Sequence, residues 1–395
     1  MKYSTRIDGI VTGGNDGWGV YYRARQMKAA GEPVTMLSIG DHDIKTDTMI
    51  LDAMKASMDA GNLGYAPVSG SEGLREAIAE RITARTATPA RKDNIVVTPG
   101  GQSALYSAML ATLDPGQSCI VLDPFYATYE QTIRAASAEP LPVVCSADDG
   151  FQPDLASIAS TIRPDTGAIL INTPNNPSGA VYRRDRLEGL ASLCRDRGIW
   201  LISDEVYDTQ VWQTEFISAR DLPGMADHVI VVNSLSKSHA MTGSRIGWVL
   251  APEPVQERLA NLLIATNYGL PGFIQDAAEF AIRHGQQAED AVVARYRDRR
   301  EAALTALGNG PGFRIVPPEG GMYIMLDIRE TGLSGDAFAD RLLDSELIGV
   351  MPGESFGRAT AGHLRIALTV PEAELTDALT RIARFAAQLA ETQAA

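Results

Sequence analysis

Seven short apolar runs, most of them separated by helical stretches, constrain the fold of this chain more than any other feature. The runs cover residues 95–98, 119–122, 141–145, 168–172, 199–203, 229–233 and 245–251. Helical patterns include those at 102–113, 125–137 and 184–197. Strands that alternate with helices in this way form a mainly parallel sheet covered by helices. We therefore predict an α/β fold.

The last link of this series differs from the others. Between residues 233 and 245 there are too few residues for a crossover helix of the usual length. The seventh strand is therefore predicted to run antiparallel to the sixth. Residues 286–307, rich in Ala, Arg and Glu, predict a long helix that leaves the sheet, and 313–390 predicts a smaller α+β unit.

Composition and charge exclude several classes of partner. The net charge of −14 argues against nucleic acid and anionic membranes. No apolar run approaches the roughly 18 residues of a membrane span, and residues 1–11 contain no signal-peptide core. The three cysteines are far apart and lack metal spacing. We expect reduced thiols, no metal site and a cytoplasmic location.

The stretch after the sixth apolar run carries the strongest chemical signal. Ser234 and Ser236 offer two hydroxyls, Lys237 follows at once, and Arg245 comes eight positions later. Hydroxyls and an arginine suit a phosphate. A lysine held beside a phosphate ester could form a Schiff base with an aldehyde on the same ligand, and pyridoxal 5'-phosphate (PLP) is such a ligand. Alone, the motif also fits a solvated basic loop.

Polar residues follow two earlier runs. Asp204 ends the run at 199–203, at the sheet edge where open α/β sheets bind ligands. It could hold a protonated pyridine nitrogen or cap a helix. Tyr207 could reach the phenolic oxygen of the same ring, or simply pack. Asn176 lies in a rigid turn after 168–172 and can donate an N–H to a phenolate.

A glycine pair precedes the predicted helix at 102–113. Gly100 and Gly101 permit close approach of the main chain, and the free N–H groups of a helix N-terminus can cradle a phosphate. The alternative is a helix capped by Ser103 with no ligand.

Together these motifs resemble the class I/II aminotransferase family of fold-type I PLP enzymes. The segments that carry the resemblance are Gly100-Gly101-Gln102-Ser103-Ala104-Leu105, Asp123-Pro124-Phe125-Tyr126-Ala127-Thr128-Tyr129, Asn175-Asn176-Pro177-Ser178-Gly179, Asp204-Glu205-Val206-Tyr207, Ser234-Leu235-Ser236-Lys237 through Arg245, and Leu364-Arg365-Ile366-Ala367. They occur in family order over nearly the whole chain, from roughly residue 35 to residue 370.

The resemblance implies a role for each matched residue. Lys237 would carry the cofactor and shuttle a proton, with Asp204 and Tyr207 as its catalytic partners on the ring nitrogen and the phenolic oxygen. The further cofactor-binding residues would be Gly101, Gln102, Ser103, Tyr126 stacked on the ring, Asn176, Ser234, Ser236, Arg245, and Tyr65 from the neighbouring subunit.

The resemblance also implies a substrate site. Arg365 would bind the substrate carboxylate through its planar guanidinium, together with Asn176 and the main chain of Gly40. A structural partner for Arg365, such as Asp327, is the alternative. Relatives often carry Glu-Pro-Asp after this glycine, whereas the present chain has Asp41-His42-Asp43.

The implied architecture is a large domain with a seven-stranded, mostly parallel sheet plus a smaller α+β domain. The expected boundaries are an N-terminal arm at 1–32, a small domain from 33–50 and 290–395, and a PLP-binding domain at 51–289. The resemblance also implies a homodimer with shared active sites. The glycine-rich segment 13–22 would cover the active-site entrance or pack on the neighbouring subunit.

The implied function is transamination of an L-amino acid with a 2-oxo acid acceptor by a ping-pong mechanism. One alternative is a carbon–sulfur β-lyase of the same fold. Another is a PLP-sensing transcription regulator, for which the roughly 35 residues before the match are too few to form a DNA-binding domain. The particular amino acid stays open, and the aromatic cluster Trp18, Tyr21 and Tyr22 favours apolar or aromatic side chains.

Overall fold

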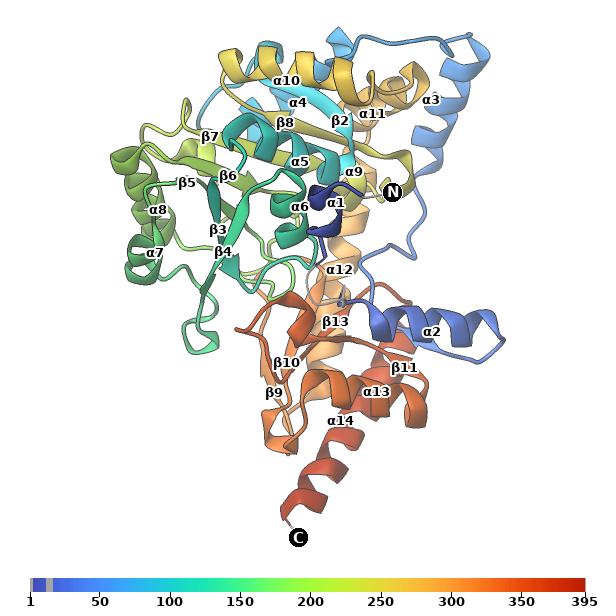
Figure 1. Ribbon diagram of the computed structural model, residues 1–395. Helices are drawn as coiled ribbons and strands as arrows, with labels where there is room; N and C mark the ends of the chain where they lie inside the picture. The colour runs from blue at the N-terminus through green and yellow to red at the C-terminus, as the bar shows by residue number, and fades with distance from the viewer. Residues whose placement is uncertain (1–2, 12–16, 395) are drawn as a thin grey trace.

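A seven-stranded sheet forms the upper part of the molecule in Figure 1, a computed structural model that describes residues 3–11 and 17–394. The strands lie in the order β2-β8-β7-β6-β5-β3-β4. Their bounds are β2 (Ile95–Pro99), β3 (Ser118–Asp123), β4 (Glu139–Val144), β5 (Thr166–Asn172), β6 (Trp200–Asp204), β7 (Val229–Ser234) and β8 (Ile246–Leu250). Strand β8 runs antiparallel to both neighbours and the other pairs are parallel. The predicted fold class is confirmed.

Alternate residues of the inner strands belong to two separate cores. Along β7, Val229 and Val231 pack into one core, while Ile230 and Val232 pack into the other. A sheet covered on both faces needs unbroken apolar strands, which explains the apolar runs in the sequence. The helices that contribute to the first core are α3 (Thr48–Asp59), α4 (Glu72–Arg85), α7 (Leu155–Thr161), α8 (Arg184–Arg197) and α11 (Gly272–His284), and those of the second are α5 (Gly100–Thr112), α6 (Tyr129–Ala135) and α10 (Glu253–Thr266).

A smaller antiparallel sheet forms the lower part of the molecule in Figure 1. Its strands are β12 (Met351–Pro352), β13 (His363–Ala367), β10 (Tyr323–Asp327) and β9 (Arg314–Val316), in that order. Two-residue strands β1 (Thr35–Met36) and β11 (Ile348–Gly349) pair in parallel beside it. The helices there are α2 (Gly19–Ala29), α13 (Gly335–Glu346) and α14 (Glu372–Ala394). The long helix α12 (Gln286–Leu307) extends from the upper part to the lower part.

One expected helix is shorter than predicted. Residues 125–137 were expected to be helical, but α6 begins only at Tyr129. The preceding residues instead make a contact with the C-terminal part of the chain, where the Phe125 N–H donates to the Phe356 carbonyl oxygen at 2.9 Å. A long-range contact of this kind leaves no trace in local periodicity.

The remaining helices are α1 (Thr5–Asp8) and α9 (Leu235–Ser238). Within the described ranges, no helix is long and apolar enough to cross a membrane. Part of the glycine-rich segment, Gly13, Gly14, Asn15 and Asp16, lies outside the described residues. The predicted domain boundaries stay a prediction.

Candidate active site

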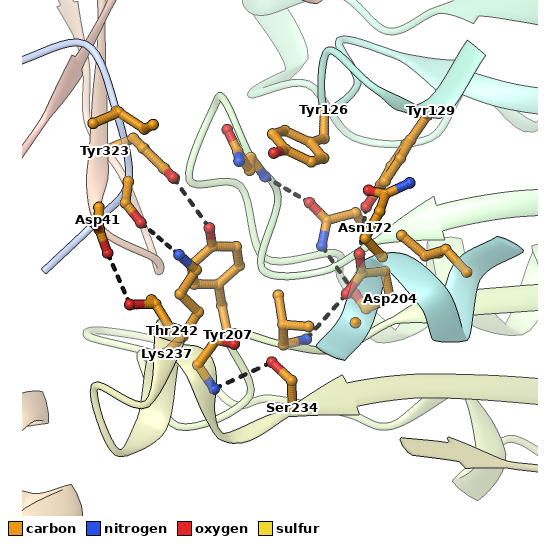
Figure 2. A pocket seen from close by; sticks show the side chains of 18 of the residues that line it. Asp41, Tyr126, Tyr129, Asn172, Asp204, Tyr207, Ser234, Lys237, Thr242 and Tyr323 are labelled. Carbon is orange, nitrogen blue, oxygen red and sulfur yellow. Dashed lines mark hydrogen bonds between the residues drawn. The ribbon is translucent and has the colours of Figure 1, made fainter. Parts of the chain in front are cut away.

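A cavity of about 300 Å³ lies at the carboxyl ends of β5, β6 and β7 (Figure 2). Each of these strands ends in a polar residue that lines it, namely Asn172, Asp204 and Ser234. The other lining residues are Trp18, Ile39, Gly40, Asp41, Gly101, Gln102, Leu105, Tyr126, Tyr129, Asn176, Val206, Tyr207, Ser236, Lys237, Thr242, Arg245, Tyr323 and Arg365. Most of the residues predicted from the sequence are therefore brought together here.

Lys237 lies in the one-turn helix α9, directly after β7. The Ser234 hydroxyl caps this turn by accepting the Ser236 N–H at 3.3 Å. The Lys237 ammonium donates to the Gly40 carbonyl oxygen, as Figure 2 shows. A Cβ atom at Gly40 would lie 1.8 Å from the Tyr323 hydroxyl, so only glycine lets the main chain at this position lie so close to Tyr323.

Asp204 is a carboxylate buried at the end of β6, with only 5% of its surface exposed. The Tyr129 hydroxyl donates to it at 2.7 Å and the Val206 N–H at 3.2 Å. Burial raises the pKa of Asp204 to about 6, and the hydrogen bond from Tyr129 works against that rise. A desolvated carboxylate of this kind favours a cationic ligand group beside it.

A second set of groups in the same cavity suits an anion. Helix α5 begins at Gly100, so the N–H groups of its first turn, which includes Gly101 and Gln102, lack intrahelical partners. Arg245 approaches this turn so closely that a Cβ atom at Gly100 would lie 2.3 Å from its guanidinium. The hydroxyl-bearing residues Ser234 and Ser236 line the same cavity.

Two predicted cofactor residues differ in detail from the expectation. The Gln102 side chain is engaged elsewhere, because it donates to Thr132 at 2.7 Å and accepts from Thr128 at 2.9 Å. Its main chain is the part left for an anion. Ser103 does not line the cavity.

Arg365 is a fully buried cation with neutral neighbours. It is 1% exposed, and its guanidinium carbon lies 4.4 Å from the ring centroids of both Tyr323 and Phe356. It donates to the Asn176 side-chain oxygen at 3.0 Å and to the Ser38 carbonyl oxygen. Burial lowers its pKa.

No carboxylate pairs with Arg365 among the described residues, and its Nε has no hydrogen-bond partner there. Asp327, the structural partner considered from the sequence, instead accepts hydrogen bonds from Arg329 and Arg314. The guanidinium is therefore left to attract an anion from outside the chain.

Two neutral side chains complete the cavity, and the sequence patterns did not indicate either. Asn172 accepts the Asn176 N–H at 2.7 Å and donates to the Asp204 carbonyl oxygen at 2.9 Å, which ties two strand ends together. The Tyr323 hydroxyl lies 3.2 Å from the Tyr207 hydroxyl. Tyr129, the partner of Asp204, lies in the same sequence motif as Tyr126, but the motif did not indicate a role for it.

Tyr65 is the second predicted cofactor residue that the structure does not bring to the cavity. It does not line the cavity and is 92% exposed, with its ring 5.2 Å from that of Tyr268. Within one chain it cannot contribute to the site.

Comparison with known proteins agrees with this geometry. The family model described as aminotransferase class I and II matches residues 32–382. An arginine–pyruvate transaminase from Pseudomonas aeruginosa is 43% identical over 98% of this chain and 99% of its own length. An aspartate/prephenate aminotransferase from Thermus thermophilus is 33% identical over 92% of this chain and 93% of its own length. A solved structure of a Thermus thermophilus aspartate aminotransferase with maleate has a TM-score of 0.89 and 31% identity, covering 97% of this chain and 99% of that one.

The fold is that of the fold-type I PLP enzymes, with one antiparallel strand in a seven-stranded sheet. The chain belongs to the aminotransferase class I and II family, and it is an aminotransferase. The activity supported by its relatives is transamination, and the relatives named above are all transaminases or aminotransferases. None of them supports the lyase alternative.

Proposed function

We propose that PLP is the cofactor and that it binds in the cavity at the ends of β5, β6 and β7. The fit rests on three groups: the buried Asp204 carboxylate for a ring nitrogen, the Ser234, Ser236, Arg245 and α5 cluster for the phosphate, and Lys237 for the aldehyde. Asn176 and Tyr207 would hold the phenolic oxygen. When bound, PLP supplies an acceptor for the electrons released as the substrate Cα–H bond breaks.

The residues of this chain would then have separate roles in the reaction. Arg365 binds the α-carboxylate of the amino acid, which orients the Cα–H bond towards Lys237. The Lys237 amine removes the proton from Cα. Asp204 keeps the ring nitrogen protonated through its negative charge, and Tyr129 holds that carboxylate in place at 2.7 Å.

The observation that carries the substrate site is the buried Arg365 without a carboxylate partner among the described residues. Its fork of N–H groups matches a carboxylate in a bidentate manner, whereas lysine is a point charge. We expect Arg365→Lys to raise KM for amino acids and 2-oxo acids by about tenfold or more, since a charge-assisted hydrogen bond contributes about 1.5–3 kcal/mol. PLP affinity and the visible spectrum should stay unchanged. Equal penalties for amines that lack a carboxylate would overturn the assignment.

The cofactor assignment has its own test. Reduction of the purified protein with borohydride, followed by peptide mapping, should place the pyridoxyl group on Lys237. A label on another lysine would refute the role proposed for Lys237 without affecting the family assignment.

The donor substrate is proposed to carry a cationic side chain, with pyruvate as acceptor, as in the name of the 43% identical relative. The charges of the cavity support this choice. Lys237, Arg245 and Arg365 already have roles, and no further lysine or arginine among the described residues lines the cavity to bind a distal carboxylate. Asp41, by contrast, lines it with a carboxylate. This proposal replaces the preference for apolar or aromatic side chains drawn from the sequence.

A substrate panel tests the choice of donor. Arginine, lysine, alanine, phenylalanine and aspartate should each be assayed with pyruvate and with 2-oxoglutarate. We expect arginine with pyruvate to have the highest kcat/KM. A preference for aspartate or phenylalanine would reject the cationic donor while leaving transamination intact.

The active protein is proposed to be a homodimer in which Tyr65 reaches the phosphate of the partner's cofactor. The 92% exposure of Tyr65 in the single chain supports this idea. The cytoplasmic location stays a prediction.

A further inference from the structure

His42 lies beside the turn that carries Lys237. Its Nε2 atom is 3.0 Å from the carbonyl oxygen of Ser236, the residue directly before Lys237. Its Nδ1 atom is 2.8 Å from the Tyr296 hydroxyl. His42 therefore connects the turn that carries Lys237 with Tyr296.

The contact with Ser236 fixes the position of one ring proton. A carbonyl oxygen only accepts, so Nε2 must carry a proton and donate to Ser236. In the neutral ring, Nδ1 accepts the hydroxyl proton of Tyr296. Burial, and next the charge of Lys237, lower the pKa of His42 to about 4, while Asp41 and Asp43 act in the opposite direction. The imidazole is therefore neutral at physiological pH.

Helix α12 holds this arrangement from behind. Tyr296 is completely buried in α12, and its ring packs edge-on to the imidazole with the centroids 5.4 Å apart. Three residues further along α12, Arg299 donates to both carboxylate oxygens of Asp43 at 2.8 and 2.6 Å. The helix thus fixes His42 and the residue after it, and His42 in turn reaches the Lys237 turn.

We propose that His42 is a positioning residue that anchors the main chain at Ser236 to Tyr296 of α12 and so directs the Lys237 amine towards its reaction partner. The hydrogen bond from Nε2 holds the peptide group between Ser236 and Lys237. Without it, the turn keeps its cap from Ser234 but loses its hydrogen-bonded link to Tyr296 of α12. The proposal rests on the role proposed for Lys237, which borohydride labelling tests separately.

The test compares His42→Leu with His42→Gln. Leucine removes the donor, whereas the glutamine amide can still donate to the Ser236 carbonyl. We expect His42→Leu to lower the single-turnover rate of the amino-acid half-reaction about fivefold to tenfold, the size of one hydrogen bond, with KM changed less than twofold. The pH midpoint of the visible band of the substrate-free PLP enzyme should shift as well. His42→Gln should restore most of both properties.

Thr46→Val is the matched control. It removes a 2.7 Å hydrogen bond to the same turn, from the Thr46 hydroxyl to the Ala240 carbonyl oxygen, three residues beyond Lys237. We expect this variant to keep the wild-type midpoint. The proposal is overturned if His42→Leu retains the wild-type rate and midpoint, if glutamine gives no rescue, or if Thr46→Val produces the same shift.

A measurement on the unaltered enzyme covers the case in which His42→Leu does not fold. In the ¹⁵N-histidine NMR spectrum of the holoenzyme, assigned with the His42→Gln variant, the His42 ring should be neutral at pH 7 with its proton on Nε2. A neutral ring with its proton on Nδ1 would exclude the hydrogen bond to Ser236 and with it the positioning role.

Discussion

At the scale of single residues, the cavity contains two charged side chains, Asp204 and Arg365, that form no ion pair within the described part of the chain. Asp204 is held by a tyrosine hydroxyl and a main-chain N–H, and Arg365 by two neutral oxygens. Burying such charges costs free energy, which ligand groups of opposite sign can recover on binding. The two residues lie in one cavity, so a single ligand set can neutralise both.

Replacement of Asp204 by asparagine tests the first of these charges. The amide keeps the size of the side chain but cannot attract a protonated ring nitrogen. We expect kcat to fall by at least about a hundredfold, since the loss of a buried charge pair corresponds to several kcal/mol. PLP affinity, measured by equilibrium dialysis, should fall far less, because the phosphate groups remain. Near-native turnover would show that Asp204 only caps the strand end.

Asp41 is the residue on which the choice of donor side chain depends. One of its oxygens accepts the Thr242 hydroxyl at 2.9 Å, and its side chain is exposed at the cavity. We expect Asp41→Asn to lower kcat/KM for arginine about fivefold to tenfold, as for one exposed charge-assisted contact, and to leave alanine unchanged. Steady-state kinetics with both donors measure the ratio. A parallel loss for alanine would assign Asp41 to the loop rather than to the substrate.

Glu205, next to Asp204, predicts a pH dependence of stability that is independent of catalysis. It is 3% exposed, and one oxygen accepts from the Ala219 N–H at 2.9 Å and the Ser203 hydroxyl at 3.0 Å. Burial raises its pKa from 4.5 to about 8. Because the pKa of this carboxyl is higher in the folded than in the unfolded protein, its protonation stabilises the fold. The contribution is complete below the pKa of the unfolded state and is lost as pH rises towards 8.

Glu205→Gln removes this titration and keeps the acceptor oxygen. The melting temperature of the wild type should therefore fall relative to that of the variant between about pH 5 and pH 8, as followed by circular dichroism. If the melting temperatures of the wild type and the variant change in parallel over this pH range, the pKa of Glu205 is not raised.

At the scale of elements, the sharp turn from β2 into α5 determines whether Arg245 can reach the anion site. Gly100 has φ +78°, a region that side chains disfavour, and a Cβ atom there would meet the Arg245 guanidinium. We expect Gly100→Ala to weaken PLP binding about tenfold or more, while the KM for amino acids in the PLP-saturated enzyme stays near normal. Titration of the apoenzyme with PLP measures the change.

Gly243→Ala offers the control for this substitution. Gly243 lies in the same loop as Arg245, and a Cβ atom there would meet nothing within 4 Å. Its PLP affinity should match that of the wild type. Equal weakening in both variants would contradict the steric explanation.

At the scale of the whole molecule, the chain exposes several large apolar side chains, two of which, Tyr65 and Tyr268, are in ring contact. They gather in α3, the loop after it and the end of α10, and include Met49 57%, Met58 42%, Leu63 63%, Tyr65 92%, Ile264 53% and Tyr268 54% exposed. Exposed apolar groups of this kind mark interaction surfaces. Two-fold dimers are the commonest homo-oligomers, and such a surface suits one.

A complementation experiment tests whether the sites are shared. Lys237→Ala and Tyr65→Ala homodimers should each be impaired. After unfolding and refolding together, a mixed dimer would contain one intact site, because the intact Lys237 and the intact Tyr65 come from different chains. We expect activity to rise towards a quarter of the wild-type value, since random mixing yields mixed dimers in about half of the molecules. Activity no higher than the mean of the two parents would exclude a shared site.

Much of the site could be predicted because it is encoded locally. Asp204 and Ser234 each end an apolar run, and Lys237 follows a serine-rich turn, so order along the chain already places them at one edge of a parallel sheet. The periodicity of the strands and helices determined the α/β class for the same reason. Alternation of apolar runs with helices depends on neighbours within a few residues.

The remaining groups were decided by the tertiary structure alone. Tyr129 meets Asp204 across 75 residues of sequence, Tyr207 meets Tyr323 across 116, and His42 meets Ser236 across 194. No local pattern distinguishes Tyr129, Tyr323 or His42 from ordinary packing residues. Their function depends on which elements come together in space, because a hydrogen bond requires its two partners within about 3 Å regardless of their separation in the chain. The sequence by itself determined the sheet and the place of Lys237 at its edge, and the packing of distant segments decided what surrounds that lysine.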